Sequence, residues 1–148
     1  MKPKGLGISR FVKTQLFITL GVLYATGIIW LILHYLLVTE SEYVAIQSPL
    51  EPLVMVIHGS MVPFFLMVVG ALFPLHIERA WKSKKNIITG IIVLTVIAVL
   101  IGSGCLLYYC GNETLRKFSS LSHSIIGALV VPVFIAHIYF GKKSLIKE

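Results

Sequence analysis

Charged side chains are missing from four long stretches of this 148-residue chain, and that absence limits what the protein can be. The uncharged stretches cover residues 14–39, 52–77, 86–111 and 118–141. Only 13% of the residues are charged, 57% are hydrophobic, and the mean hydropathy is +0.91. Each stretch is longer than the roughly 20 apolar residues that a helix needs to cross a bilayer. Four such helices occupy most of the chain, which leaves no room for a sizeable soluble domain.

Carboxylates and cysteines are scarce as well. The spans have almost no carboxylate beyond Glu51 and Glu78 at their ends, whereas a proton or metal transporter would be expected to bury some. The only two cysteines, Cys105 and Cys110, lack the C-x-x-C-H spacing of covalently attached haem. Two small buried or interfacial thiols are the favoured interpretation, and a disulfide stays open, because it becomes feasible if the third helix ends before Gly111. The chain also has no catalytic triad, dinucleotide motif or iron–sulfur cysteine set.

Basic residues are distributed unevenly along the chain. The N-terminal tail, the segment 79–85 and the C-terminal tail hold all but two of the 13 Lys and Arg residues. The acidic segment between the first two spans contains none. By the positive-inside rule, this asymmetry predicts that both termini are cytoplasmic. The net charge of +7 therefore indicates topology and contact with anionic lipid rather than binding to nucleic acid.

The pattern predicts an all-α membrane protein, a bundle of four transmembrane helices that forms a single domain over residues 1–148. The expected helices cover residues 11–38, 50–78, 86–109 and 118–140, and the segments 39–49 and 110–117 are expected to be external loops. The first apolar run is too long for a signal peptide, so we expect it to be retained as a helix. Pro63 and Pro74 should kink the second helix, because each removes a backbone donor.

Histidine is the unusual residue of these spans, and four of the five histidines form two pairs. His58 and His76 lie 18 residues apart on the second expected helix, and His123 and His137 lie 14 apart on the fourth. At about 100° per residue, both spacings bring the two imidazoles back to nearly the same helix face. Histidine within a bilayer is costly and usually functional. Two imidazoles at each depth would fill both axial positions of a haem iron, which suits electron transfer.

A weak internal repeat relates the two halves of the chain. Each half has an outward helix with a small residue followed by glycine, at Thr26-Gly27 and at Ser103-Gly104. An inward helix with one histidine in each leaflet follows in both halves. Such a parallel repeat, about an axis along the membrane normal, would let the second and fourth helices present their histidines to one another.

Four helices, cytoplasmic termini and the His123–His137 pair resemble the four-helix bis-histidine dihaem membrane cytochrome b family. This family includes quinone-linked membrane subunits of formate dehydrogenases and nickel–iron hydrogenases, and the resemblance covers essentially the whole chain. It implies two haem b groups, with His58 and His123 as ligands of the outer haem. His76 and His137 would be the ligands of the inner haem. Several relatives take an inner ligand from the start of the first helix, where this chain has no histidine, so His76 is the available substitute.

The resemblance also implies a function and a location. The chain would be an electron-transfer subunit of a larger quinone-linked oxidoreductase in the inner (plasma) membrane of a prokaryote. Expected partners are quinone or quinol, the lipid bilayer, and other redox subunits such as a cytochrome c, an iron–sulfur subunit or a dehydrogenase subunit. Two alternatives stay open, namely a histidine-dependent proton or metal transporter and a cofactor-free membrane anchor subunit.

Other polar residues near the span ends have several open roles. His34, near the outer end of the first span, could contact a quinone or a haem propionate, replace His58 as a ligand, or simply lie at the interface. If quinol is oxidised outside, His34 or Glu51 would be a suitable proton acceptor, since imidazole changes its protonation near neutral pH. The cations Arg79, Arg116 and Lys117 could hold haem propionates, or they could be ordinary topology signals that snorkel to the interface.

Overall fold

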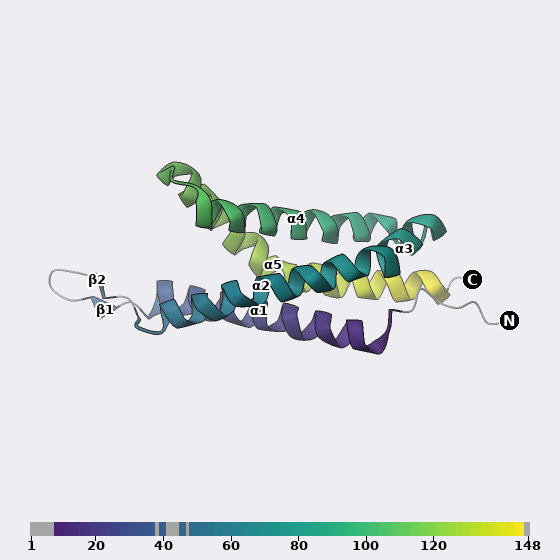
Figure 1. Cartoon of the computed structure of the whole chain (residues 1–148), viewed down its shortest axis with the longest axis horizontal. Coiled ribbons are helices and arrows are strands. Elements are labelled where there is room, and N and C mark those ends of the chain that lie inside the picture. Colours follow the sequence, from purple (N-terminus) through teal and green to yellow (C-terminus); the bar gives the residue numbers. More distant parts are fainter. Residues whose placement is uncertain (1–7, 38, 41–44, 47, 147–148) are drawn as a thin grey trace. The chain divides into compact units, whose positions relative to one another are not determined.

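Two helical hairpins make up nearly all of the computed structural model, which describes residues 8–37, 39–40, 45–46 and 48–146 (Figure 1). The first hairpin lies within residues 1–76 and the second within residues 77–148. Each hairpin is a compact unit and is described by itself. The prediction that all four helices form one bundle stays a prediction.

The first hairpin pairs α1 (Arg10–Leu36) with α2 (Glu51–Leu72). The hydroxyl of Ser9 caps α1 by accepting a 3.3 Å hydrogen bond from the backbone N–H of Val12. Pro52 lies in the first turn of α2, where its missing N–H costs no helical bond. The segment predicted as a loop contains two short antiparallel strands, β1 (Thr39–Glu40) and β2 (Ala45–Ile46). The sequence does not predict strands of two residues, because a strand is recognised from a longer alternation of apolar and polar residues.

The second predicted helix is interrupted rather than uniform. After α2 the chain continues as a π-helical turn, η1 (Phe73–Ile77), and then as α3 (Glu78–Ser83). Pro74 lies in η1, whereas Pro63 is accommodated within α2. A π-turn has i→i+5 hydrogen bonds and is wider than an α-turn. The rotation of about 100° per residue therefore does not apply across η1, and the argument that His58 and His76 share one face loses its geometric basis.

The second hairpin pairs α4 (Ile87–Tyr109) with α5 (Glu113–Ile146). α5 begins before its predicted start at residue 118 and ends after its predicted end at residue 140. The early start has a local cause, because the Asn112 side chain accepts a 2.9 Å hydrogen bond from the Leu115 N–H. An ion pair of 2.8 Å between Glu113 and Lys117 supports the same turn. Arg116 and Lys117 consequently lie in the first turns of a helix and not in a loop.

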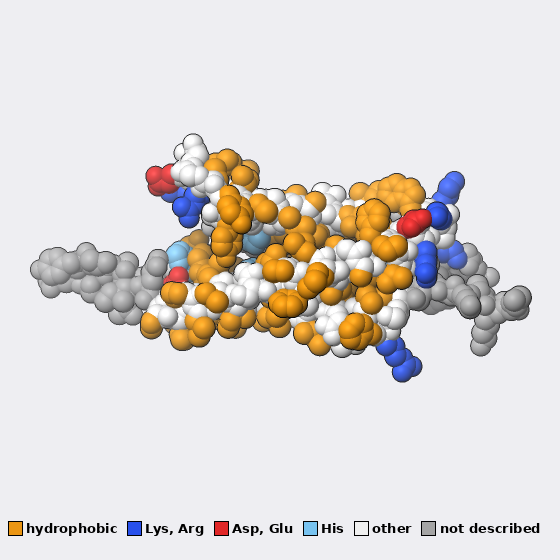
Figure 2. Space-filling view, viewed as in Figure 1, with side chains coloured by type: hydrophobic (Ala, Val, Ile, Leu, Met, Phe, Trp, Pro, Cys, Tyr) orange, Lys and Arg blue, Asp and Glu red, His pale blue; other side chains and the backbone are white. Residues whose placement is uncertain are grey.

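All four long helical segments have the length and apolarity to cross a membrane. They span Arg10–Leu36, Glu51–Ser83, Ile87–Tyr109 and Glu113–Ser144. Figure 2 shows apolar side chains over the visible surface of the helices and charged side chains near the helix ends. Large apolar residues such as Ile88 and Phe118 are about 77% and 68% exposed. Helices that are apolar on all faces suit a lipid environment. The predicted all-α class with four candidate spans is confirmed, and the prediction of which side holds the termini stays a prediction.

Candidate functional site

Three of the four paired histidines contact the same kind of two-residue step on the neighbouring helix of their own hairpin. We call this step, a Ser or Thr followed by Gly, the hydroxyl–glycine step. In each case the hydroxyl oxygen contacts Nδ1 of the imidazole, and the glycine lies against its Cε1 atom. The three pairs are Thr26-Gly27 with His58, Ser103-Gly104 with His123, and Thr89-Gly90 with His137.

The contact at His58 fixes which ring nitrogen carries the proton. The Oγ1 atom of Thr26 lies 2.9 Å from Nδ1 of His58 and 2.7 Å from the carbonyl oxygen of Val22. Two oxygen atoms approach this closely only when the hydroxyl donates its single proton to the carbonyl. The hydroxyl must then accept from the ring, so Nδ1 carries the hydrogen. In this tautomer of the neutral imidazole the lone pair is on Nε2, the nitrogen that can bind a metal.

The second hairpin repeats this arrangement at His123. The Oγ atom of Ser103 lies 2.9 Å from Nδ1 of His123 and 2.7 Å from the carbonyl oxygen of Val99. The same proton count applies, and it again assigns the lone pair to Nε2. The repeat that the sequence predicted at Thr26-Gly27 and Ser103-Gly104 is therefore one of side-chain contacts as well as of residue types.

The glycines allow each ring to lie directly on the backbone of the adjacent helix. A Cβ atom at Gly27 would be 3.5 Å from Cε1 of His58, and one at Gly104 would be 3.6 Å from Cε1 of His123. At Gly90 the corresponding distance to Cε1 of His137 is 3.8 Å. A methyl group would just touch the ring, and any longer side chain would displace it. Hydroxyl and glycine together therefore set both the tautomer and the position of the imidazole.

His137 has a larger polar network than the other two histidines. Thr89 Oγ1 lies 2.8 Å from Nδ1 of His137 and donates to Oδ1 of Asn86 over 2.7 Å. The Asn86 amide donates in turn to the backbone oxygen of His137 over 3.1 Å. A Cβ atom at Gly141 would be 3.2 Å from Asn86 Nδ2, so this glycine leaves room for the amide. The network ties the start of α4 to α5.

Sequence reasoning missed Asn86 and Thr89-Gly90, although a signal for them existed. Thr89-Gly90 precedes Ser103-Gly104 by 14 residues, the spacing that separates His123 from His137. In an antiparallel hairpin, equal spacings on the two helices bring both pairs into contact. α1 has one hydroxyl–glycine step, Thr26-Gly27, and none near its N-terminus. His76 lies in the π-turn η1 and, like the other three paired histidines, is half-buried.

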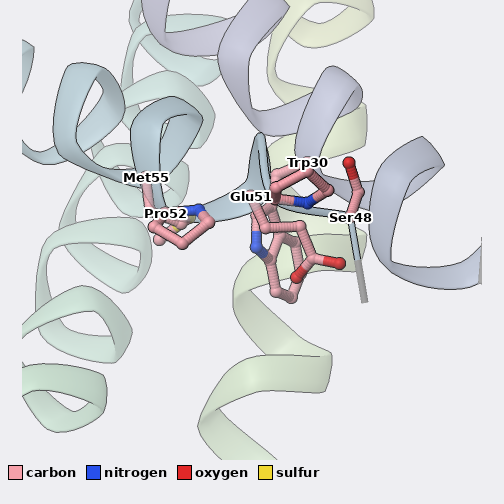
Figure 3. Close-up of a pocket in the computed structure, with 6 residues that line it drawn as sticks. Trp30, Ser48, Glu51, Pro52 and Met55 are labelled. Atoms are coloured by element: carbon pink, nitrogen blue, oxygen red, sulfur yellow. The ribbon is translucent and has the colours of Figure 1, made fainter. Parts of the chain in front are cut away.

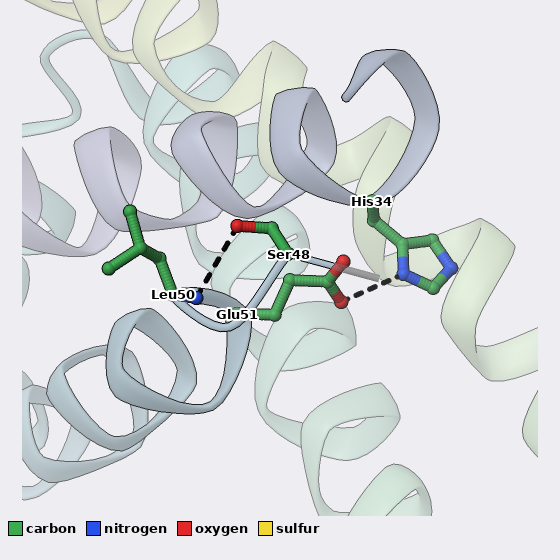
Figure 4. Close-up of polar contacts among 4 residues, drawn as sticks. All are labelled: His34, Ser48, Leu50 and Glu51. Carbon is green, nitrogen blue, oxygen red and sulfur yellow. Dashed lines mark hydrogen bonds and ion pairs between the residues drawn. The ribbon is translucent and has the colours of Figure 1, made fainter. Parts of the chain in front are cut away.

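His34 lies beside Glu51 at the loop end of the first hairpin. Its Nδ1 atom is 3.0 Å from the Oε2 atom of Glu51 (Figure 4). The imidazole stacks on Trp30 with ring centroids 4.5 Å apart and an interplanar angle of 14°, and the Tyr35 ring meets it edge-on at 4.8 Å. Of the roles left open for His34, the structure adds one specific partner, a carboxylate. His34 and Glu51, which the sequence suggested as alternative proton acceptors, thus form a hydrogen bond with one another.

The remaining predicted residues lie at helix ends. Arg79 in α3 and Arg116 and Lys117 in α5 are all exposed. Lys117 pairs with Glu113, and the propionate-binding role of these cations stays a prediction. Cys105 and Cys110 are free thiols, although α4 ends at Tyr109, before Gly111, where the sequence left a disulfide open.

Comparison with protein-family models, curated proteins and solved structures finds no match to this chain.

Replacing Ser103 by Ala should destabilise the second hairpin, because the N–H at Nδ1 of His123 loses its acceptor. We expect a loss of about 1 kcal/mol in the free energy of unfolding in detergent micelles. Nitrogen-15 NMR of the labelled imidazole should also show that His123 no longer keeps a single tautomer. Ser122→Ala is the matched control, since among the described residues the Ser122 hydroxyl donates to the Phe118 carbonyl of its own helix and contacts no histidine. Equal effects of the two substitutions would contradict the assignment.

Proposed function

We propose that this chain is a dihaem b-type membrane cytochrome subunit that transfers electrons between the quinone pool and partner redox subunits. The observation that carries the proposal is the repeated contact between a helix hydroxyl and Nδ1 of a histidine in a span. Histidines that bind metals usually donate their second ring N–H to an acceptor, which fixes the tautomer and strengthens the ligand. Thr26 and Ser103 supply this acceptor at His58 and His123, whereas Nδ1 of His137 contacts both the Thr89 hydroxyl at 2.8 Å and the Asn86 amide nitrogen at 3.4 Å.

The residues present fit the chemistry of a bis-imidazole haem. Each imidazole with an Nδ1 proton has its lone pair on Nε2, and the glycine beneath the ring holds it in one orientation. A haem with two imidazole ligands has no open position for a gas and cycles its iron between the ferric and ferrous states. The chain's own contribution is to bind, to orient the rings and to surround them with apolar side chains that exclude water.

Chain topology supports the ligand assignment that we propose. A chain that crosses the membrane four times has both hairpin loops on the same side. His58 and His123 each lie in the half of their helix nearer to the hairpin loop, so we assign them to one haem on that side. His137 and His76 lie toward the other side and are assigned to the second haem. This second pair is chemically unequal, because the Asn86–Thr89 network supports His137 whereas His76 lies in a π-turn.

The charge distribution supports the orientation that we propose for the chain. The termini and the connection between the hairpins contain most of the Lys and Arg residues, so we place them in the cytoplasm of a prokaryotic cell. The two hairpin loops then face the outside. Partner subunits that supply or accept electrons would dock on either side, since this chain has no dinucleotide or iron–sulfur motif of its own.

Haem content tests the proposal directly. The purified protein should show a b-type optical spectrum and a pyridine haemochrome close to two haems per chain. His123→Ala should reduce the content to about one haem, because only one of the two sites loses a ligand. A colourless wild-type protein would contradict the cytochrome function and favour a transporter or an anchor subunit.

Glycine substitutions provide a test that leaves every candidate ligand in place. Gly104→Leu should displace the His123 ring and lower haem content toward one per chain, because the side chain would occupy the space of Cε1. Gly102→Leu, two residues away on α4, should retain both haems, since no atom lies within 4 Å of a Cβ at that position. Haem per chain is measured on both folded variants. Identical haem content in the two would mean that the contact at Gly104 does not position a ligand.

The native cysteines test the orientation. In a Cys105→Ser variant the remaining thiol, Cys110, lies at the C-terminal end of α4 beside the hairpin loop. A membrane-impermeant maleimide should label it in intact spheroplasts. A cysteine placed at Ser83, in a chain without Cys105 and Cys110, should be labelled only after lysis, because Ser83 ends α3 at the opposite end of the span. The reverse labelling pattern would invert the proposed topology.

A further inference from the structure

Asn86 lies at the start of α4 but does not act as an ordinary helix cap. Its backbone is in the left-handed region, with φ of 52° and ψ of 36°. An asparagine at this position usually has an extended backbone and accepts a hydrogen bond from a backbone N–H of the first turn. The Asn86 side chain makes no such bond. Its amide extends to α5 instead, where Nδ2 donates to the backbone oxygen of His137 over 3.1 Å.

Thr89 lies in the first turn of α4, and this place limits where its hydroxyl proton can go. Thr26 and Ser103 each donate to the carbonyl oxygen four residues earlier on their own helix, over 2.7 Å. Four residues before Thr89 is Lys85, which lies outside α4. The Oδ1 atom of Asn86 takes the place of the missing carbonyl, 2.7 Å from Thr89 Oγ1, whereas the backbone oxygen of Asn86 is 3.5 Å away.

The two ends of the Asn86 amide are distinguished by their neighbours. The amide nitrogen can donate to the backbone oxygen of His137, whereas the amide oxygen in its place would face another acceptor at 3.1 Å. The nitrogen therefore faces α5 and the oxygen faces Thr89. Two oxygen atoms 2.7 Å apart need a proton between them, and only the Thr89 hydroxyl can supply it.

The short contacts of this network decide the tautomer of a neutral His137 ring. Once the Thr89 hydroxyl donates to Asn86, its 2.8 Å contact with Nδ1 of His137 requires a hydrogen on Nδ1. The Asn86 Nδ2 atom lies 3.4 Å from the same Nδ1, which is long for an N–H donor. A proton arrangement that satisfied this long contact would leave one of the two short contacts without a proton.

The first turn of α2 also contains a side chain that crosses to the partner helix. Glu51 lies beside Trp30 in the lining of a hollow (Figure 3), and its Oε2 atom is 3.0 Å from Nδ1 of His34 on α1. Its other oxygen has no partner among the residues that the structure describes. Asn86 differs in that both ends of its amide have partners, so two contacts fix its orientation.

We propose that Asn86 is a positioning residue that keeps the hydrogen of His137 on Nδ1, acting through the Thr89 hydroxyl. The inference rests on the proposed function, in which Nε2 of His137 binds haem iron. In the Nδ1–H tautomer the lone pair is on Nε2. A hydrogen bond from Nδ1–H to an acceptor makes the ring a stronger ligand, which favours the ferric state and lowers the reduction potential. Asn86 thereby tunes one of the two proposed haems.

Glycine at position 86 tests the side chain without disturbing the backbone. Asn86→Gly removes the amide, and glycine adopts the left-handed conformation readily. Lys84→Gly is the matched control, because Lys84 is exposed and has nearly the same backbone conformation, with φ of 55°. Both substitutions are made in the full-length protein in detergent micelles.

Redox potentiometry measures the effect, and the haem that His137→Ala removes identifies the one concerned. For that haem, Asn86→Gly should raise the midpoint potential. The ferrous-to-ferric ratio should increase about 5-fold, or about 40 mV at about 59 mV per tenfold change, as for the loss of one hydrogen bond. Lys84→Gly should leave both potentials unchanged. Wild-type potentials in Asn86→Gly, or equal shifts in the two glycine variants, overturn the proposal.

A double substitution shows whether Asn86 acts through Thr89. Thr89→Val removes the hydroxyl at similar side-chain size and should raise the same midpoint potential, which also covers the case in which Asn86→Gly does not fold. Adding Asn86→Gly to Thr89→Val should cause no further shift, because the hydrogen bond at Nδ1 is already lost. An unchanged potential in Thr89→Val, or a further shift of similar size in the double variant, overturns the proposal.

Nitrogen-15 NMR of histidine-labelled protein separates this inference from the proposed function. A haem-containing protein whose potentials ignore Asn86→Gly contradicts the role of Asn86 alone. A colourless wild-type protein contradicts the cytochrome function, and the tautomer of His137 is then measured directly. Hydrogen on Nδ1 in the wild type, with a mixture of tautomers in Asn86→Gly, supports the role of Asn86, whereas hydrogen on Nε2 in the wild type overturns it.

Discussion

The hydrogen bond from an imidazole N–H to a helix hydroxyl is the interaction on which the candidate sites depend. Within an apolar environment an imidazole needs a partner, and the hydroxyls of Thr26, Thr89 and Ser103 provide one at 2.8–2.9 Å. The hydroxyls of Thr26 and Ser103 each donate their proton to a carbonyl of their own helix, so these two hydroxyls can only accept from the ring. For a neutral imidazole, the tautomer at His58 and His123 is thereby decided by the neighbouring helix rather than by solvent.

Close packing of the two helices in each hairpin also fixes the position of the imidazole. The glycine after each hydroxyl removes the side chain that would otherwise separate the imidazole from the adjacent backbone. Small residues serve helix association in membranes generally, and here they also fix the depth and rotation of a histidine. The end of the first hairpin follows a different logic. There Glu51 and His34 satisfy one another only in part, and Oε1 of Glu51 is buried without a hydrogen-bond partner among the described residues.

The sequence was sufficient for the spans and for the histidines, because apolar length and the cost of an imidazole in lipid are properties of residues. It was insufficient where a single side chain decides the outcome. The Asn112 cap moved the start of α5 ahead of the apolar run, and the π-turn at Pro74 disrupted a register computed for a uniform helix. The contact between His34 and Glu51 joins residues on two different helices, and the hydrophobic periodicity of a single helix does not predict such a pair. The contact of Thr89-Gly90 with a histidine, by contrast, is predictable from the spacing between Thr89-Gly90 and Ser103-Gly104.

The proposed function requires that Nε2 of the paired histidines binds haem iron. Low-temperature electron paramagnetic resonance of the oxidised, purified protein tests this most directly, because the signal reports the axial ligands of ferric haem. We predict low-spin spectra of two bis-imidazole haems and no substantial high-spin signal. A predominantly high-spin spectrum, or the absence of any haem signal, would contradict the account.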